Sequence, residues 1–388
     1  GTLFRSVRML DKARDWNDFR AALSYWDVPA QNFVFADVDG NIGYQTPGRI
    51  PIRSKGNGSV PAPGYSGEYE WTSFIPFDEL PRVYNPAKGY VVTANNAVVP
   101  TSFKYFIGND WAAPYRAMRI EAGIRAKPKL GVQDMRDIQA DVQSIPAQTL
   151  AAYLANPAPA DDRCKKAVEA LRVWDGRLTV DSVAGTVAEV ALVKTMRNTF
   201  GDELGDLADG YLAGGVPNLL RLLAQPDSAW WDNAATAQRE KRDDILLLSL
   251  NQALDEISTR LGSDMAGWQW GKLHTATFAH PLGSVQPLNL IFNSGPHSTP
   301  GDGFTPDNNA FNWKTYAQTT VSSYRQIIDL SGFSMSVFQH TTGESGQPFS
   351  RHYTDFVPAW IAVAHHPMWY SRGDVVANRE GILVLTPR

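Results

Sequence analysis

The chain has 388 residues, of which 43% are hydrophobic and 20% are charged, a balance typical of a globular protein with a large core. The formal net charge of −4 gives no general attraction for nucleic acid or for an anionic membrane surface, and no apolar run is long enough to span a bilayer. The single cysteine, Cys164, excludes an intrachain disulfide framework and a cysteine-based zinc cluster.

Residues 1–113 are predicted to form a β-rich segment that opens with a helix. Apolar side chains recur at helical spacing in residues 1–27, which predicts one helix there. Residues 32–46 then alternate between apolar and polar side chains as two strands do, and they flank Asp39 and Gly40. Both of these residues tolerate a positive φ angle, so the pattern predicts a β-hairpin.

A segment rich in proline and glycine follows at residues 47–88, and its length is typical of loops that are functional or that pack over a site. Residues 89–96, GYVVTANN, predict a further strand that ends at Asn95 and Asn96. An asparagine at a strand end can aim a side-chain amide donor, but asparagine is also a common turn residue. Sequence spacing alone favours the turn.

Residues 114–265 are predicted to be mainly helical, and residues 266–388 are predicted to be β-rich again. A pair of glycines, Gly214 and Gly215, is expected to interrupt the helices. The order of a β-rich part, a helical insertion and a second β-rich part predicts one interrupted α+β domain. In the last part, we predict strands at residues 274–280, 323–330, 333–340 and 382–387, and one short helix at residues 358–370.

The histidines do not predict a zinc site. His274 and His280 would share one face of a strand, but six residues of strand span about 20 Å, which is too far for one metal ion. His352 is a candidate acid or base, and a structural hydrogen-bonding role is the interpretation that we favour.

Several motifs occur in an order that resembles the β subunit of the penicillin amidase family. They are NFVFADVDGNIGYQTPGRIP, FDELPRVYNPAKGYVVTANN, DWAAPYRAMRIE, WGKLHTATFAHPLG, SYRQIIDLS and GESGQPFSRHYTDF, followed by a closing HHPMWYS. The resemblance covers nearly the whole chain and is weakest in the helical middle. It implies that the chain is the C-terminal part of the β subunit, and that it forms part of the four-layer αββα fold of N-terminal nucleophile hydrolases, with a helical insertion.

The resemblance implies an amide hydrolase that attacks its substrate with an N-terminal serine. In this family a precursor cuts itself, which frees the serine at the start of the β subunit, and the α-amino group of that serine, with a pKa of about 8, acts as the general base. This chain begins with Gly1 and Thr2, so we expect the nucleophile to be missing from it and the chain alone to be inactive. The alternative function is a non-catalytic binding protein that retains the acylase scaffold.

The family also implies partners and a location. The expected partners are a small-molecule amide substrate, the missing N-terminal segment of the β subunit, and an α subunit cut from the same precursor, with no nucleic acid and no membrane. The expected substrates are side-chain amides of penicillins or cephalosporins, or N-acyl homoserine lactones. The expected location is the bacterial periplasm or the outside of the cell.

Two residues match positions near the active site of the family. Asn95 matches the asparagine of the oxyanion hole, with Asn96 as the alternative one residue along, and Arg116 matches an arginine that supports the active site. For Arg116, an ion pair on the face of a helix is an equally weighted alternative. No cofactor is expected. The family often holds a structural calcium ion between its subunits, but Thr101 and Ser102 are poor substitutes for the carboxylates that many relatives carry in this loop, which makes calcium doubtful here.

Overall fold

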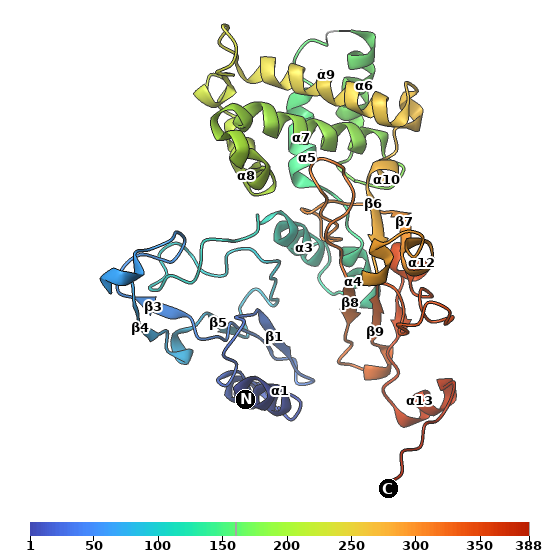
Figure 1. Cartoon of the computed structure of the whole chain (residues 1–388). Helices are drawn as coiled ribbons and strands as arrows, with labels where there is room; N and C mark the ends of the chain where they lie inside the picture. Colours follow the sequence, from blue (N-terminus) through green and yellow to red (C-terminus); the bar gives the residue numbers. More distant parts are fainter. Residues whose placement is uncertain (160, 388) are drawn as a thin grey trace. The chain divides into compact units, whose positions relative to one another are not determined.

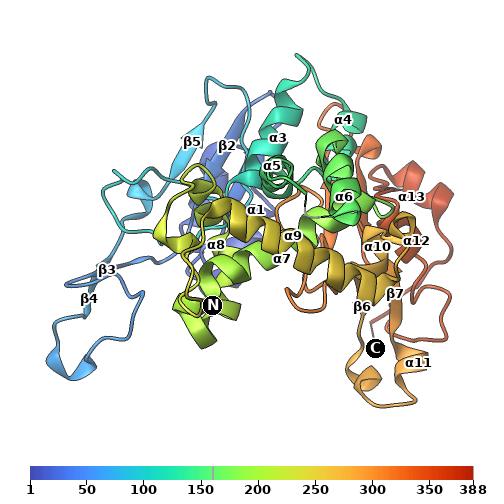
Figure 2. The ribbon, with the colours of Figure 1, turned by 90° about the horizontal axis from the view of Figure 1, so that it is seen from above.

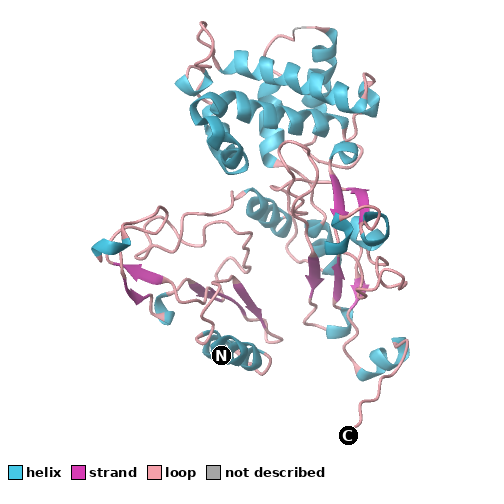
Figure 3. Ribbon diagram, viewed as in Figure 1, coloured by secondary structure: helices cyan, strands magenta, loops and turns pink. Residues whose placement is uncertain are grey.

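The computed structural model describes residues 1–159 and 161–387, and these fall into two compact units, Gly1–Ala117 and Met118–Arg388. Helices and short antiparallel strands make up both units, which confirms the α+β class (Figure 1, Figure 3). Each unit buries its own apolar core. Our division of the sequence at residues 113 and 265 stays a prediction.

The first unit opens with two helices where the sequence predicted one. Helix α1 spans Thr2–Leu10 and helix α2 spans Trp16–Leu23. The single-helix prediction for residues 1–27 is wrong because Asp15 starts a new helix, and its side chain accepts a hydrogen bond from the backbone N–H of Asp18 at 2.9 Å. An N-cap of this kind satisfies one of the unpaired donors at a helix start.

Helix α2 packs on one face of a three-stranded antiparallel sheet with strand order β1-β2-β5. The Trp16 ring stacks on Tyr84 with ring centroids 5.1 Å apart and meets Phe35 edge to face at 5.5 Å. Gly43 of β2 pairs with Phe35 on one side and with Tyr84 on the other, and its lack of a side chain leaves the space that the Trp16 ring fills. The predicted hairpin is confirmed as β1 and β2. The strands of this unit are β1 (Phe33–Ala36), β2 (Ile42–Gln45), β5 (Arg82–Tyr84) and a separate pair, β3 (Pro51–Arg53) and β4 (Trp71–Phe74).

No strand forms over residues 89–96, so that prediction is wrong. The backbone bends there instead, and Asn95 adopts a left-handed conformation with a φ angle of 64°. Asparagine tolerates this region better than most residues because its short polar side chain can bond locally. The backbone C=O of Asn95 accepts a hydrogen bond from the Ala112 N–H at 2.9 Å, which closes loop 96–111 at its base.

The second unit contains a helical bundle centred on α7. This helix is buried around its whole circumference from Gly185 to Val193, and α9 lies alongside it (Figure 1, Figure 2). The predicted interruption at Gly214 and Gly215 is wrong, because both lie inside α8, where the backbone of Gly215 lies against the Tyr211 ring. The helices are α3 (Tyr115–Arg125), which crosses the unit boundary, α4 (Val132–Gln139), α5 (Ile145–Leu154), α6 (Asp162–Val173), α7 (Val183–Leu204), α8 (Ala208–Leu222) and α9 (Arg242–Leu261).

Short antiparallel strands and helices form the rest of the second unit. Three of the four predicted strands are confirmed, and the fourth, at residues 382–387, is wrong because this segment is exposed and pairs with no described strand. The helix predicted for residues 358–370 is confirmed in its first turn only, as α12. The elements are α10 (Trp270–Leu273), β6 (Thr275–Phe278), α11 (Asn289–Phe292), β7 (Ser294–Ser298), β8 (Tyr324–Ile327), β9 (Val337–His340), α12 (Val357–Ile361), β10 (His366–Pro367) and α13 (Arg372–Asn378), with sheets β6-β7 and β10-β9-β8.

Two acidic side chains meet in the interior of the second unit. Glu189 of α7 and Asp302 are both fully buried. Asp302 accepts hydrogen bonds from the Ser144 hydroxyl at 2.6 Å and from the Phe304 backbone N–H at 2.7 Å, whereas no donor reaches either oxygen of Glu189. Burial raises the pKa of both carboxyls, and the neighbouring Asp302 raises the pKa of Glu189 further. Asp302 has hydrogen-bond donors that stabilise its charged form and Glu189 has none, so the pair favours protonation of Glu189.

Candidate active site

A cavity of about 430 Å³ lies within the first unit. Its walls come from the segment that leads into β1, from the residues between β2 and β3, and from loop 96–111 with Asn95 at its base. The walls combine apolar side chains with carboxamides, the Thr46 hydroxyl and the Asp110 carboxylate, and the described lining residues include no histidine, lysine or cysteine. The lining residues are Ala30, Gln31, Asn32, Thr46, Ile50, Asn95, Val98, Ile107, Gly108, Asn109, Asp110 and Trp111.

Asn95 lines this cavity and Asn96 does not. The Asn96 side chain closes the turn, since its Oδ1 accepts from the Ala94 N–H at 3.1 Å and its Nδ2 donates to the Ala97 C=O at 3.2 Å. The two neighbours therefore have different tasks. The Asn96 side chain is used within the turn, whereas Asn95, for which spacing alone favoured a turn role, has an amide nitrogen available to a ligand.

Arg116, in the first turn of α3, donates from Nη2 to Oδ1 of Asn95 at 2.9 Å. A guanidinium has only donors, so the atom that it contacts must be the amide oxygen, and the amide nitrogen of Asn95 stays a donor. Burial lowers the pKa of the half-buried Arg116, although a guanidinium remains charged at neutral pH. Among the described residues no carboxylate pairs with Arg116, so the ion pair that was its alternative is not formed.

The pair formed by Asn95 and Arg116 is an oriented hydrogen-bond donor. The positive guanidinium holds the amide oxygen, so the N–H groups are turned away from Arg116. A fixed donor of this kind can stabilise the negative oxygen that develops during acyl transfer, because it needs no reorganisation when the charge appears. The strand end that was expected to hold Asn95 is replaced by a left-handed turn, by the Ala112 hydrogen bond and by Arg116.

The sequence analysis missed a second carboxamide on the cavity wall, Asn32. The buried Tyr44, 7% exposed, has its hydroxyl 2.5 Å from Oδ1 of Asn32 and 2.6 Å from Oγ1 of Thr46. Both Asn32 and Thr46 line the cavity. Burial raises the pKa of Tyr44, so the phenol keeps its proton at neutral pH. Period-two spacing along the strand, which puts Tyr44 and Thr46 on one face, was the available signal.

Metal ligands are not gathered in the described part of the chain. Within residues 1–159 and 161–387, no group of three or more histidine, cysteine, aspartate and glutamate side chains is arranged to hold a metal ion. Thr101 and Ser102 lie exposed in a turn of loop 96–111. Neutral hydroxyls are weak ligands for Ca²⁺ compared with carboxylates, so the residues present there fit this ion poorly.

The histidines that the sequence analysis considered have structural partners. The ring nitrogens of the buried His274 lie 2.9 Å from the backbone C=O groups of Thr299 and Asn309. His352 contacts the Asp355 carboxylate through Nδ1 at 2.7 Å and accepts from Nε of Arg351 at 3.0 Å. Both ring nitrogens of His352 are thus occupied by side chains of its own loop, which fits the structural role that we favoured.

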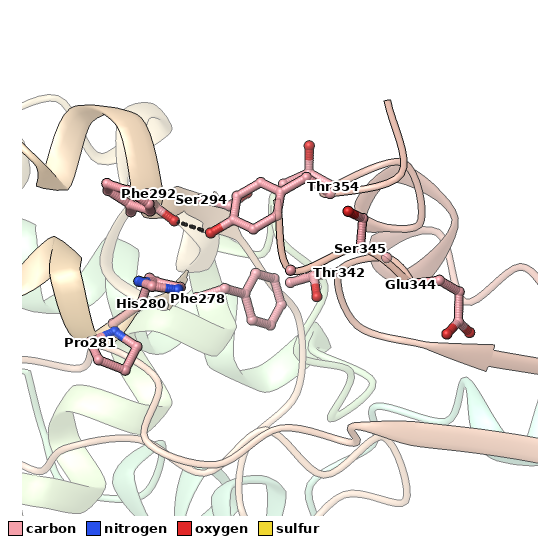
Figure 4. Close-up of a pocket in the computed structure, with 13 residues that line it drawn as sticks. Phe278, His280, Pro281, Phe292, Ser294, Thr342, Glu344, Ser345 and Thr354 are labelled. Carbon is pink, nitrogen blue, oxygen red and sulfur yellow. Dashed lines mark hydrogen bonds between the residues drawn. The ribbon is translucent and has the colours of Figure 1, made fainter. Parts of the chain in front are cut away.

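A second cavity, of about 330 Å³, lies in the second unit (Figure 4). His280 and Phe292 stack on one side with ring centroids 4.9 Å apart, and loop residues 342–346, which include the GESG motif, form the other side. The Tyr353 hydroxyl donates to the Phe292 C=O at 2.6 Å. These contacts join the loop to the connection between β6 and β7, so the cavity marks a structural junction.

Comparison with known proteins finds a matching family model, similar curated proteins and a solved structure with the same fold. A family model described as penicillin amidase matches residues 1–377. The acyl-homoserine lactone acylase QuiP of Pseudomonas fluorescens is 32% identical over 357 residues, which is 86% of this chain and 42% of that protein. The penicillin acylase 2 proenzyme of a Pseudomonas strain is 31% identical over 375 residues, which is 93% of this chain and 47% of that protein.

A solved structure, the thermostable penicillin G acylase from Alcaligenes faecalis, shares the fold. Its TM-score is 0.69 at 22% sequence identity, and the match covers 100% of this chain and 74% of that chain. This chain spans less than half the length of the two curated relatives named above.

Proposed function

Because the chain belongs to the penicillin amidase family, we propose that the whole protein is an amide hydrolase and, within that class, an acylase. The proposed substrate is an acyl side-chain amide of a penicillin or cephalosporin, or of an N-acyl homoserine lactone. The matched relatives include acylases named for both kinds of substrate. The observation that carries the proposal is the amide of Asn95, which lines a cavity and is held in one orientation by Arg116.

The proposed nucleophile is a serine outside these 388 residues. In support, none of the described cavity-lining residues is a histidine, lysine or cysteine, and the chain spans less than half of its curated relatives. Cleavage of a precursor would free this serine as the first residue of its chain. Its α-amino group, with a pKa of about 8, would then accept the proton of its own hydroxyl. An α subunit from the same precursor would complete the enzyme.

The proposed reaction has two acyl-transfer steps. The serine oxygen bonds to the amide carbon, the carbonyl oxygen becomes negative, and the α-amine passes the hydroxyl proton to the leaving nitrogen as the C–N bond breaks. An acyl-serine and a free amine result. Water then adds to the acyl-serine in the same way and releases the carboxylic acid and the serine.

In both tetrahedral intermediates, we propose that Nδ2 of Asn95 donates to the oxyanion. Arg116 is a positioning residue in this proposal, because it contacts Asn95 and keeps the amide oxygen turned away from the substrate. A binding protein on the same scaffold is the alternative function, and such a protein would not need a donor for negative charge that develops only in a transition state. No described helix is long and apolar enough to cross a membrane, and we propose a periplasmic or secreted location from the family resemblance.

The test is kinetic and uses the complete precursor with its upstream segment. We expect Asn95→Ala to lower kcat by roughly 100- to 1000-fold with a smaller change in KM, because the donor acts on charge that exists only in the transition state. Asn96→Ala is the neighbouring control and should lose far less activity, since the Asn96 side chain closes the turn and does not line the cavity. An unchanged kcat in Asn95→Ala would remove this residue from the oxyanion hole.

A double-mutant cycle tests the role of Arg116. If Arg116 acts only through Asn95, then Arg116→Ala should lower kcat in the wild-type background and have little further effect in the Asn95→Ala background. Additive losses would show that Arg116 acts on the substrate directly.

A further inference from the structure

A hydrogen-bond chain behind the cavity wall determines which atoms of Asn32 face a ligand. In the structure the Tyr44 side chain contacts Oδ1 of Asn32, and an amide oxygen can only accept a hydrogen bond. The Tyr44 hydroxyl is therefore the donor, and the amide oxygen of Asn32 is the acceptor. Because Tyr44 has only one hydroxyl proton, the contact of 2.6 Å with Thr46 requires the Thr46 hydroxyl to donate to Tyr44.

This arrangement leaves the Nδ2 group of Asn32 as an unused donor. Asn32 is exposed on the cavity wall, and no described residue accepts a hydrogen bond from its amide nitrogen. The other two lining carboxamides, Asn109 and Gln31, differ from Asn32. Asn109 donates from Nδ2 to the Ser59 hydroxyl at 2.9 Å, and no described side chain holds Gln31 in one orientation.

The cavity therefore contains two carboxamides whose oxygen accepts a hydrogen bond from another side chain and whose nitrogen stays available. Asn95 is held through its oxygen by Arg116, and Asn32 is held through its oxygen by Tyr44. A substrate with a single carbonyl group would need only one of these donors. Ile50, Val98 and Ile107 on the same wall are apolar, whereas Thr46 and Asp110 add a hydroxyl and a carboxylate to the lining.

We propose that Asn32 donates a hydrogen bond to a second oxygen of the substrate, separate from the carbonyl of the amide that is cleaved, and that it selects substrates carrying such an oxygen. This proposal rests on the acylase function proposed above. The oxygen belongs either to an oxo group on the acyl chain or to a carbonyl of the leaving amine, such as a lactone. Tyr44 acts as a positioning residue, because it touches Asn32 and not the substrate.

The experiment uses the complete precursor and three substrates. A plain acyl anilide has only the scissile carbonyl, a 3-oxoacyl anilide adds an oxygen on the acyl side, and a plain acyl homoserine lactone adds one on the amine side. We expect Asn32→Ala to lower kcat/KM by about tenfold on one or both of the substrates with a second oxygen, and by less than about twofold on the plain anilide. A loss confined to the 3-oxoacyl anilide places the oxygen on the acyl chain, and a loss confined to the lactone places it on the amine.

Tyr44→Phe tests the positioning role. The variant keeps the buried ring and removes the donor to Asn32, so it should reproduce the substrate dependence of Asn32→Ala with a smaller loss. Tyr25→Phe is the matched control, since the Tyr25 ring lies 3.7 Å from the guanidinium carbon of Arg5 and Tyr25 does not line the cavity. It should leave all three values of kcat/KM unchanged.

Two results would overturn the inference. An equal loss on all three substrates in Asn32→Ala would show a structural role or a role at the scissile carbonyl, and no loss on any of them would show that Asn32 binds nothing. Absence of turnover of every substrate by the wild-type precursor is a different result, because it would overturn the acylase function and this inference with it.

Discussion

Glu189 shows how burial changes the chemistry of a single side chain. Burial, together with the neighbouring Asp302, raises its pKa above the value of about 4.3 that is usual for an exposed glutamate. The folded protein therefore holds a proton that the unfolded chain releases at neutral pH. Protonation of Glu189 therefore contributes to the free energy of unfolding. This contribution is complete below about pH 4 and is lost as the pH rises toward the pKa of Glu189 in the folded protein.

We expect Glu189→Gln to remove this loss of stability with rising pH. Glutamine keeps the shape of the acid and carries no titratable proton, so the free energy of unfolding of the variant, relative to wild type, should increase as the pH rises above about 4. Urea denaturation at a series of pH values measures it. Glu169→Gln, an exposed substitution on α6, is the control and should follow the wild-type curve. Parallel curves for Glu189→Gln and wild type would show that Glu189 is ionised in the folded protein.

The sequence was sufficient to choose residues of the candidate site but not to orient them. The match to family motifs pointed to Asn95 and Arg116, with Asn96 as the alternative one residue along, and the structure places Asn95 and not Asn96 on the cavity wall. The contact between Arg116 and Asn95 joins residues 21 positions apart. The hydrogen bonds that link Asn32, Tyr44 and Thr46 depend on the burial of Tyr44. Such contacts exist only after the hairpin and the loop have folded, so periodicity and spacing do not contain them.

The break between α1 and α2 is the clearest case in which one residue defines an element. Asp15→Ala removes the side-chain acceptor for the Asp18 N–H, and we expect it to lower the free energy of unfolding by ~1 kcal/mol. Asp15→Ser keeps a capping oxygen and should restore most of the loss. Chemical denaturation followed by Trp16 fluorescence would measure both variants, since Trp16 is the first residue of α2 and packs on the sheet. Equal stability of the alanine and serine variants would show that the cap contributes nothing.

Long periodic segments were predicted well, and short apolar segments were not. Most of the helices between residues 114 and 265 follow from their pattern, because α7 and α9 are long enough for the helical period to be unambiguous. The segments at residues 89–96 and 382–387 have strand-like composition but find no partner strand among the described residues. Strand formation depends on pairing with a distant segment, which local composition does not record.

The surface of the chain exposes many large apolar side chains. Phe4 is 81% exposed and Leu290 is 80% exposed, and others of this kind occur in both units. We expect the rest of the proposed acylase to cover some of these side chains, because removing an apolar side chain from water is favourable.

At the scale of the whole molecule, we expect residues 1–388 alone to show no acylase turnover. The reason is that the proposed serine and its α-amine lie outside them. Release of a chromophore from an acyl anilide measures the activity, and the complete precursor prepared in the same way is the positive control. Turnover by the isolated chain would show that one of its own residues is the nucleophile.

The hydrogen bond between Ala112 and Asn95 ties together the two ends of loop 96–111, and six cavity-lining residues lie between those ends. The Asn95 amide is thereby held independently of changes within the loop. Evolution, or a mutant library built in the laboratory, can alter the length and side chains of this loop while the hydrogen bond at its base keeps the proposed oxyanion donor in place.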